Sequence, residues 1–132
     1  MARILLIDDD DLLRDVLTTA LTHAGHTVYQ AADGAQGCEI FNATPVDLVL
    51  TDIIMPGQEG IETIMHLRHL NPRLPIIAMS GGATNSKVYL SLAAQLGARH
   101  VLAKPFTPDA LAAAIADLLP PASPSPASPS AA

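Results

Sequence analysis

Polar residues of types that suit phosphoryl chemistry follow several short apolar segments of this chain. They are Asp8 and Asp9, Asp52, Ser80 and Lys104. Clustered carboxylates repel one another, so bringing the three acids together requires a cation. Mg²⁺ suits carboxylate oxygens and typically takes one or two of them together with phosphate oxygens. A lysine adds a charge that pairs with phosphate, and a serine adds a hydroxyl. Backbone N–H groups near Ala83 would add further donors. This combination indicates phosphoryl transfer to a carboxylate, where positioning and charge neutralisation supply most of the catalysis.

The elements that must position these residues alternate along the chain. Apolar runs predict strands over residues 3–7, 27–31, 47–51, 75–79 and 100–103, and helical spacing predicts helices over 11–24, 33–41, 61–70, 85–96 and 108–119. This alternation predicts an α/β fold with a doubly wound parallel sheet, right-handed crossovers and helices on both faces. Sites of such sheets lie outside the carboxyl ends of the strands, where the polar residues fall.

Taken singly, the same residues have simpler interpretations. Acids that follow a strand commonly cap the next helix, and Asp9 or Asp10 is placed to cap the helix over 11–24. One such residue would therefore be weak evidence for a site. The prediction depends on suitable residues following four strands that share an edge.

The composition excludes several classes of function. The chain has 132 residues, enough for one domain, and a net charge of −6. Without a cluster of Lys and Arg it has no electrostatic basis for binding nucleic acid or an anionic membrane. No apolar segment approaches the ~20 residues that span a bilayer, and the chain begins without the apolar segment of a signal peptide. We therefore expect a cytoplasmic protein.

The last part of the chain differs in composition from the rest. Residues 120–132 consist of Pro, Ser and Ala and contain no large apolar side chain. Such a segment cannot bury enough surface to fold, so we expect it to be extended and solvated. We therefore predict one folded domain over residues 1–119, followed by an inert tail or a linker over 120–132.

Four segments resemble the receiver domains of bacterial two-component response regulators. They read ILLIDDDDLLR, DLVLTDIIMPGQEGIE, PIIAMSGG and LGARHVLAKPF, and the likeness runs from about Arg3 to about Leu119. The resemblance implies a CheY-like, flavodoxin-like fold of three layers. Its five-stranded parallel sheet would have the order 2-1-3-4-5 and carry five helices. It further implies a signalling phosphoacceptor, and not an enzyme with a separate substrate.

The resemblance assigns the acids to the metal and the phosphoryl acceptor. Asp52 would attack the phosphorus of a phosphohistidine and become the 4-aspartylphosphate. Asp9, Asp52 and the backbone carbonyl of Ile54 would bind Mg²⁺ directly, with Mn²⁺ as a possible substitute. Asp8 would bind the same ion through a water molecule.

The remaining site residues would contact the phosphoryl group. By the same resemblance, the Ser80 hydroxyl and the Ala83 backbone N–H would bond phosphoryl oxygens after transfer. Lys104 would form an ion pair with the phosphoryl group. Because family members commonly have a cis bond at the matching place, we expect a cis peptide bond between Lys104 and Pro105.

The chain departs from the family pattern at three positions. Receivers usually carry an aromatic residue three positions before the lysine, where this chain has Val101. His100 does not replace that residue, because adjacent strand residues point to opposite faces. Ile54 and Gly82 stand where polar side chains tune dephosphorylation in the family. Neither can orient an attacking water, so we expect a comparatively long-lived phosphorylated state.

The resemblance also implies partners. The upstream partner would be a histidine kinase or a histidine phosphotransfer domain. We expect it to dock on the start of the helix over 11–24 and on the loop after the last strand, through Asp11, Arg14, Pro105 and Phe106. Output would be by contact with a downstream protein and not with nucleic acid.

Alternatives remain open at this stage. The chain could be a single-domain response regulator, which we favour, or the amino-terminal receiver of a larger one. A metal-dependent phosphatase working through an aspartyl-phosphate would usually have a second acid two residues after the nucleophile, where this chain has Ile54. A scaffold that ignores phosphate would normally have lost some of the five polar residues, all of which are present.

Overall fold

The computed structural model describes residues 2–53, 59–81, 91, 94–104 and 106–118, with Glu59 and Lys104 described by their backbones alone. Five strands form one sheet: β1 (Arg3–Ile7), β2 (Thr27–Ala31), β3 (Leu48–Asp52), β4 (Ile76–Gly81) and β5 (His100–Lys104). Their order is β2-β1-β3-β4-β5, and each neighbouring pair is parallel. The predicted doubly wound sheet and its strand order are confirmed.

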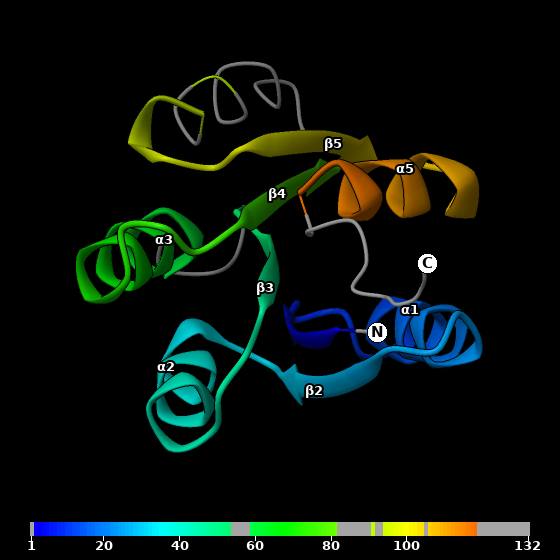
Figure 1. The fold of residues 1–132 in the computed structure, drawn as a ribbon, viewed down its shortest axis with the longest axis horizontal. Coiled ribbons are helices and arrows are strands. Elements are labelled where there is room, and N and C mark those ends of the chain that lie inside the picture. The colour runs from blue at the N-terminus through cyan, green and yellow to red at the C-terminus, as the bar shows by residue number, and fades with distance from the viewer. Residues whose placement is uncertain (1, 54–58, 82–90, 92–93, 105, 119–132) are drawn as a thin grey trace, which may run out of the picture.

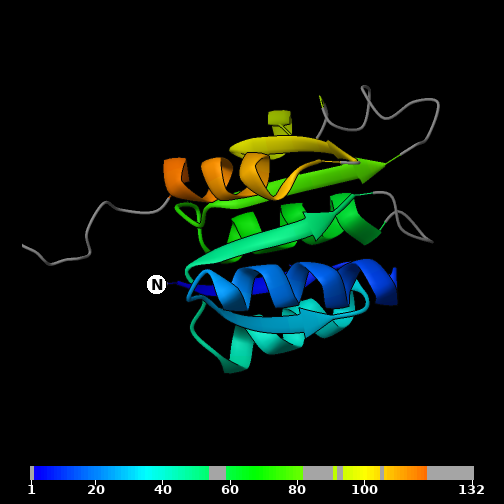
Figure 2. The same cartoon turned by 90° about the vertical axis from the view of Figure 1, so that its right-hand side faces the viewer.

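Helices cover both faces of the sheet, as predicted for a three-layer fold. The structure describes α1 (Asp11–His23), α2 (Gly34–Ala43), α3 (Glu59–Leu70) and α5 (Pro108–Leu118). In Figure 1, α1 and α5 lie on one side of the strands and α2 and α3 on the other. Figure 2 shows the strands running in the same direction, with the N-terminus at the edge away from their carboxyl ends. The helix predicted over 85–96 lies largely outside the described residues, and its described residues, Ser91 and 94–96, are helical.

The hydrophobic core has two halves, one on each face of the sheet. On the α2/α3 face the buried side chains include Leu5, Ile7, Val49, Ile64, Leu67 and Ile76. On the α1/α5 face they include Ile4, Leu6, Leu17, Leu21, Leu50, Ile77, Leu111 and Ile115. Alternate residues of β1 serve opposite halves, which explains why its sequence is a continuous apolar run.

The site-bearing strand β3 ends one residue later than predicted, at Asp52 and not at Thr51. Asp52 pairs in register with Met79 of β4, and the Ile53 N–H donates to the Met79 carbonyl at 2.9 Å. The apolar pattern ends at Leu50, but the backbone hydrogen bonds continue beyond it. Asp52 is therefore held by the sheet and not by a loop.

Acidic N-caps start the first two helices. Asp10 caps α1, since its carboxylate accepts from the Leu13 N–H at 3.1 Å. Asp33 caps α2 in the same way through Gln36 N–H at 2.8 Å, while the Gln36 side chain accepts from the Ala32 N–H at 3.0 Å. Of the two candidates for the cap of α1, Asp10 has that role.

His26 ties the start of β2 to the start of β1. Its Nδ1 accepts a hydrogen bond from the Ala2 N–H at 3.1 Å, and burial lowers the pKa of His26 below its usual 6.5. Both observations favour the neutral ring, because a protonated Nδ1 cannot accept a hydrogen bond and burial penalises the charged form. The folded state therefore disfavours protonation more than the unfolded state does.

We expect acid to remove the contribution of His26 to stability. That contribution is fully present above the unfolded pKa and is lost as the pH falls through the lower folded pKa. After allowance for solvent screening, the loss is below about 1 kcal/mol. Urea unfolding at neutral and mildly acidic pH should show a smaller pH dependence for His26→Gln than for the parent protein.

Candidate functional site

Three acids predicted from the sequence meet at the carboxyl edge of the sheet. One carboxylate oxygen from each of Asp8, Asp9 and Asp52 lies within 4.8 Å of the others. The strand register explains the meeting, because Ile7 of β1 pairs with Thr51 of β3 and the next residue on each strand is an acid. Asp8 is 0 % and Asp52 4 % exposed, whereas Asp9 is exposed.

This donor set fits a hard divalent cation. Like charges at such separations repel, and two of the three carboxylates are buried, where water screens poorly. Oxygen donors on two adjacent strands and an open third acid match the way Mg²⁺ is held, by one or two carboxylates with other positions left for water and phosphate. The three acids therefore form a candidate cation site.

The segment after β1 is held by local hydrogen bonds. The Asp10 N–H donates to Asp8 Oδ1 at 2.9 Å, and the Asp8 N–H donates to the Ala31 carbonyl at 3.1 Å. The guanidinium of Arg14 donates to the Asp8 carbonyl at 2.7 Å. Asp8 is thus fixed both through its backbone and through its side chain.

Ser80 lies on β4, the strand next to Asp52. It follows Met79, the register partner of Asp52, and is 0 % exposed. Within the described part of the chain its Oγ is buried without a hydrogen-bond partner. Buried hydroxyls are normally paired, so this atom has capacity left for a ligand at the same edge.

The remaining predicted residues are described only in part. The backbone of Lys104 pairs with Gly81 of β4, so β5 ends at the same edge as the acids. Ile54, Ala83 and Pro105 lie outside the described residues, as do Gly82 and the predicted cis peptide bond. Their roles stay predictions.

The side chains of β5 point as expected from the prediction that His100 does not replace the aromatic residue missing at position 101. His100 Nε2 lies 3.3 Å from Asp117 Oδ2 on α5, so this side chain is directed to the α5 face. Leu102 packs on the same face, and Val101 between them is 36 % exposed. His100 therefore does not occupy the position that Val101 leaves without an aromatic ring.

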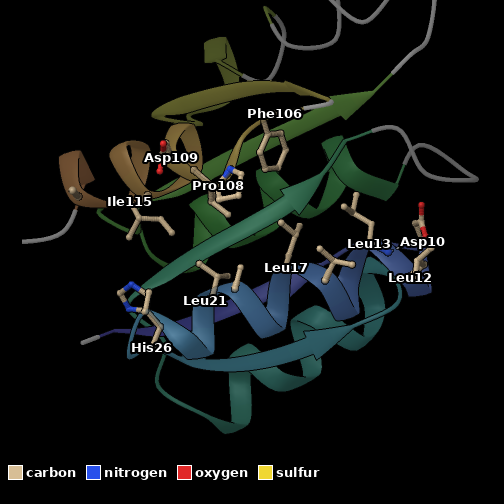
Figure 3. Close-up of a pocket in the computed structure, with 16 residues that line it drawn as sticks. Asp10, Leu12, Leu13, Leu17, Leu21, His26, Phe106, Pro108, Asp109 and Ile115 are labelled. Carbon is tan, nitrogen blue, oxygen red and sulfur yellow. Dashed lines mark hydrogen bonds between the residues drawn. The ribbon is translucent and has the colours of Figure 1, made fainter.

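A groove between α1 and α5 was not predicted. It has a volume of about 960 Å³ and runs from Asp10, near the acids, to His26 at the other end of α1 (Figure 3). Leu12 is 75 % and Val16 55 % exposed along it, and Phe106 lines it from the segment before α5. α1 thus presents two large apolar side chains to the groove and not to the core.

The predicted docking residues lie in different surroundings. The Asp11 side chain is 84 % exposed at the start of α1, and Phe106 is half-buried in the groove. The Arg14 side chain is only 14 % exposed and donates to three acceptors. The α1/α5 groove could have been found from one signal in the sequence, the large apolar residue Leu12 directly after an acidic run.

Comparison with known proteins identifies the relatives of the chain. The model of the response regulator receiver domain family matches residues 4–116. The chain is 35 % identical over 113 residues to the uncharacterized transcriptional regulatory protein YrkP of Bacillus subtilis, covering 86 % of this chain and 47 % of that protein. It is 36 % identical over 118 residues to the transcriptional regulatory protein GlrR of Escherichia coli, covering 89 % of this chain and 26 % of that protein. The chain thus spans less than half of these curated relatives.

Solved structures agree with the sequence comparison. A response regulator receiver domain protein from Clostridium thermocellum is similar with a TM-score of 0.83 and 29 % identity, covering 89 % of this chain and 94 % of that one. The response regulator TrrA of Thermotoga maritima, solved with Mg²⁺ and BeF, has a TM-score of 0.80 and 30 % identity, covering 90 % and 100 %. Among the described residues of the present chain, no helix has the length and apolarity to cross a membrane.

Proposed function

Given that this chain belongs to the response regulator receiver domain family, we propose that it is a Mg²⁺-dependent phosphoacceptor that takes a phosphoryl group onto Asp52. The observation that carries the proposal is the meeting of Asp8, Asp9 and Asp52 within 4.8 Å. Asp52 is buried and held in the sheet, which suits a nucleophile that must keep one orientation. The chain would work in the cytoplasm of a bacterial two-component system.

Each described residue contributes a distinct part of the chemistry. Asp9 and Asp52 would hold Mg²⁺ directly and Asp8 through water, and the bound ion would neutralise charge on the transferring group. An Asp52 carboxylate oxygen attacks phosphorus in line while the bond from phosphorus to the donor's nitrogen breaks. The Ser80 hydroxyl, unpaired within the described residues, would then donate to a phosphoryl oxygen. Lys104, at the end of β5, would pair with the phosphoryl group.

The direct test uses a small phosphodonor in place of a protein partner. The protein is incubated with acetyl phosphate and Mg²⁺, and its intact mass is measured. We expect a mass increase of one phosphoryl group that is absent when Mg²⁺ is chelated. Failure to gain the adduct under conditions where a known receiver is phosphorylated would contradict the proposal, as would an adduct that persists in Asp52→Ala.

The α1/α5 groove supports a docking site for the phosphorylated histidine partner. Asp10 lies at one end of the groove (Figure 3), and its N–H donates to Asp8 Oδ1 at 2.9 Å, so a helix seated at that end would bring a phosphohistidine toward Asp52. Leu12 and Val16 offer exposed apolar surface for the apolar stripe of such a helix. Acidic residues along the groove, Asp10 and Asp109, favour basic residues on the partner.

We expect Leu12→Asp to separate the two phosphodonors. A charge in the groove should slow transfer from a phosphorylated histidine phosphotransfer domain by tenfold or more, since a buried anchor contributes about 1–2 kcal/mol. Phosphorylation by acetyl phosphate should stay at the parent rate, because Leu12 lies outside the acid cluster. The donor is chosen as one that phosphorylates the parent protein, and both rates are followed by intact mass.

Met65→Asp is the matched control for the docking prediction. Met65 is 53 % exposed on α3, on the opposite face of the sheet. It should change neither rate. Equal slowing of transfer by both variants would show that an added negative charge slows the transfer wherever it lies on the surface, and that the groove has no special role.

The length of the relatives bears on the output. YrkP and GlrR extend well beyond the matched region, which supports the version in which such a receiver is the input part of a longer regulator. In that version any DNA contact is made by the additional parts of the protein, and the acidic receiver supplies only the switch. The single-domain version, with output to a separate protein, is the other proposal.

A further inference from the structure

We propose that Arg14 is a positioning residue that holds the segment after β1 in the form that binds Mg²⁺. The proposal rests on the proposed function and adds a residue to it. The hydrogen bonds of Arg14 among the described residues go to the Asp8 carbonyl, to Asp11 and to Gln30, and not to the carboxylate oxygens of Asp8, Asp9 or Asp52. Arg14 acts through the backbone of Asp8.

The guanidinium of Arg14 joins three parts of the chain at the acidic edge. One terminal nitrogen donates to the Asp8 carbonyl at 2.7 Å, and the other donates to Asp11 Oδ1 at 2.6 Å. Nε donates to Gln30 Oε1 on β2 at 3.2 Å. The side chain is 14 % exposed, so it is packed in place and not free at the surface.

These bonds act on the peptide that carries a metal-site acid. The Asp8 N–H is held by the Ala31 carbonyl and the Asp8 carbonyl by Arg14, so the backbone is fixed on both sides of the Asp8 side chain. The Asp8 carbonyl belongs to the planar peptide unit that joins Asp8 to Asp9, so a fixed carbonyl also orients the backbone of Asp9. Without Arg14 the Asp8 carbonyl loses its charge-assisted bond, and the turn from β1 to α1 loses one of its fixed points.

Electrostatics alone predicts the opposite effect on metal affinity. A guanidinium near three acids opposes the binding of another cation, so removal of its charge should tighten Mg²⁺ binding. Removal of a positioning contact should weaken it, since partners of metal ligands typically contribute 10–100-fold to affinity. The sign of the change therefore distinguishes the two roles.

Two substitutions separate charge from geometry. Arg14→Lys keeps the positive charge but cannot form the planar fork that reaches Asp8 and Asp11 together. Arg14→Met removes the charge and keeps most of the packing. If positioning dominates, both variants bind Mg²⁺ more weakly. Gln30→Ala, at an exposed position of β2, removes only the Nε contact and should have a smaller effect in the same direction.

Arg68 offers a matched control at the other end of the molecule. Its guanidinium also donates to backbone carbonyls, those of Asn71, Pro72 and Gly97 at 3.2, 2.8 and 2.6 Å. These carbonyls follow α3 and precede β5, at the edge opposite the acids. Arg68→Lys should lower the melting temperature and leave Mg²⁺ affinity unchanged.

The test is a calorimetric titration of Mg²⁺ into each metal-free protein, with melting temperatures measured in parallel. We expect Arg14→Lys and Arg14→Met to weaken Mg²⁺ binding about tenfold. Unchanged or tighter binding in Arg14→Lys, with the parent protein binding Mg²⁺, overturns the inference and leaves the proposed function standing. Absence of Mg²⁺ binding by the parent protein overturns both. If neither Arg14 variant folds, Gln30→Ala decides: weaker binding supports the inference, and unchanged binding overturns it.

Discussion

Asp52→Asn is expected to accept no phosphoryl group and to unfold at a higher temperature than the parent protein in metal-free buffer. The first effect follows because an amide is not a nucleophile toward phosphorus, so the adduct should be lost completely. The second follows from charge. Asp52 is 4 % exposed, and one of its oxygens lies within 4.8 Å of oxygens of two other acids.

The size of the stabilisation can be bounded. Two unit charges about 4 Å apart interact by about 4 kcal/mol at the effective dielectric typical of protein surfaces. Exposure of Asp9 and bound counter-ions reduce this, so we expect the free energy of unfolding to rise by about 1–2 kcal/mol. That corresponds to roughly 4 °C or more in melting temperature. Adding Mg²⁺ should raise the melting temperature of the parent protein and have much less effect on the variant.

Asp10→Asn is the matched control for this prediction. It removes a carboxylate of the same acidic run, but Asp10 is outside the cluster and caps α1, a role in which Asn is equally good. It should accept the phosphoryl group and show little change in melting temperature. A markedly lower melting temperature for Asp52→Asn in metal-free buffer would show that repulsion among the acids does not govern the stability of the metal-free protein.

Gly37→Val is expected to lower the free energy of unfolding by about 3 kcal/mol. Gly37 is buried on the face of α2 that packs against β1. A Cβ at this position would lie 2.5 Å from Ile7 Cδ1 and 2.9 Å from Ile7 Cγ1. Val is a better helix former than Gly by a few tenths of a kcal/mol, which is far too little to offset this overlap. Urea unfolding measures the difference.

Two further variants identify the cause of that loss. Ala35→Val adds bulk on the exposed side of α2 and should change stability by less than about 1 kcal/mol. Ile7→Val removes the Cδ1 atom nearest to the new side chain, so the double variant should be less destabilised than the sum of the single ones. Additive losses would indicate that the substitution acts elsewhere than at Ile7.

The same contact links packing to the site. Ile7 directly precedes Asp8, so a displacement of β1 by a residue at position 37 reaches the acids through one peptide bond. Gly37 is therefore required by the close approach of α2 to β1. Its sequence neighbourhood offers no sign of this, because a glycine within a helix pattern is compatible with many surroundings.

Much of the fold could be predicted because its signals are local. Strands β1 (3–7) and β2 (27–31) have the predicted bounds. The apolar runs that predicted them depend only on residues that are close together in the sequence. The ends of β3 and β4 moved by one or two residues toward the site, to Asp52 and Gly81. The polar residues at these strand ends still form backbone hydrogen bonds with the neighbouring strand. A hydrophobic pattern gives no sign of such bonds, because they do not depend on the side chain.

The residues of the site were predictable for a related reason. In a parallel sheet the polar residue after each strand must fall at one edge, so Asp8, Asp9 and Asp52 had to meet once the strand order was known. Arg14 shows where this reasoning stops. Its place on α1 suggested a docking residue, but its partners are a carbonyl, a carboxylate and an amide in three different parts of the chain.

The sequence by itself determined the order of elements and the edge at which Asp8, Asp9 and Asp52 gather, because these depend on residue type and on spacing along one strand or helix. The tertiary structure decided that Ser80 Oγ is buried without a partner among the described residues, that Arg14 faces inward and that Leu12 and Val16 line a groove. Each of these depends on how closely two elements distant in sequence approach, and on the rotation of α1 about its axis. Such distances are set by the packing of the whole core.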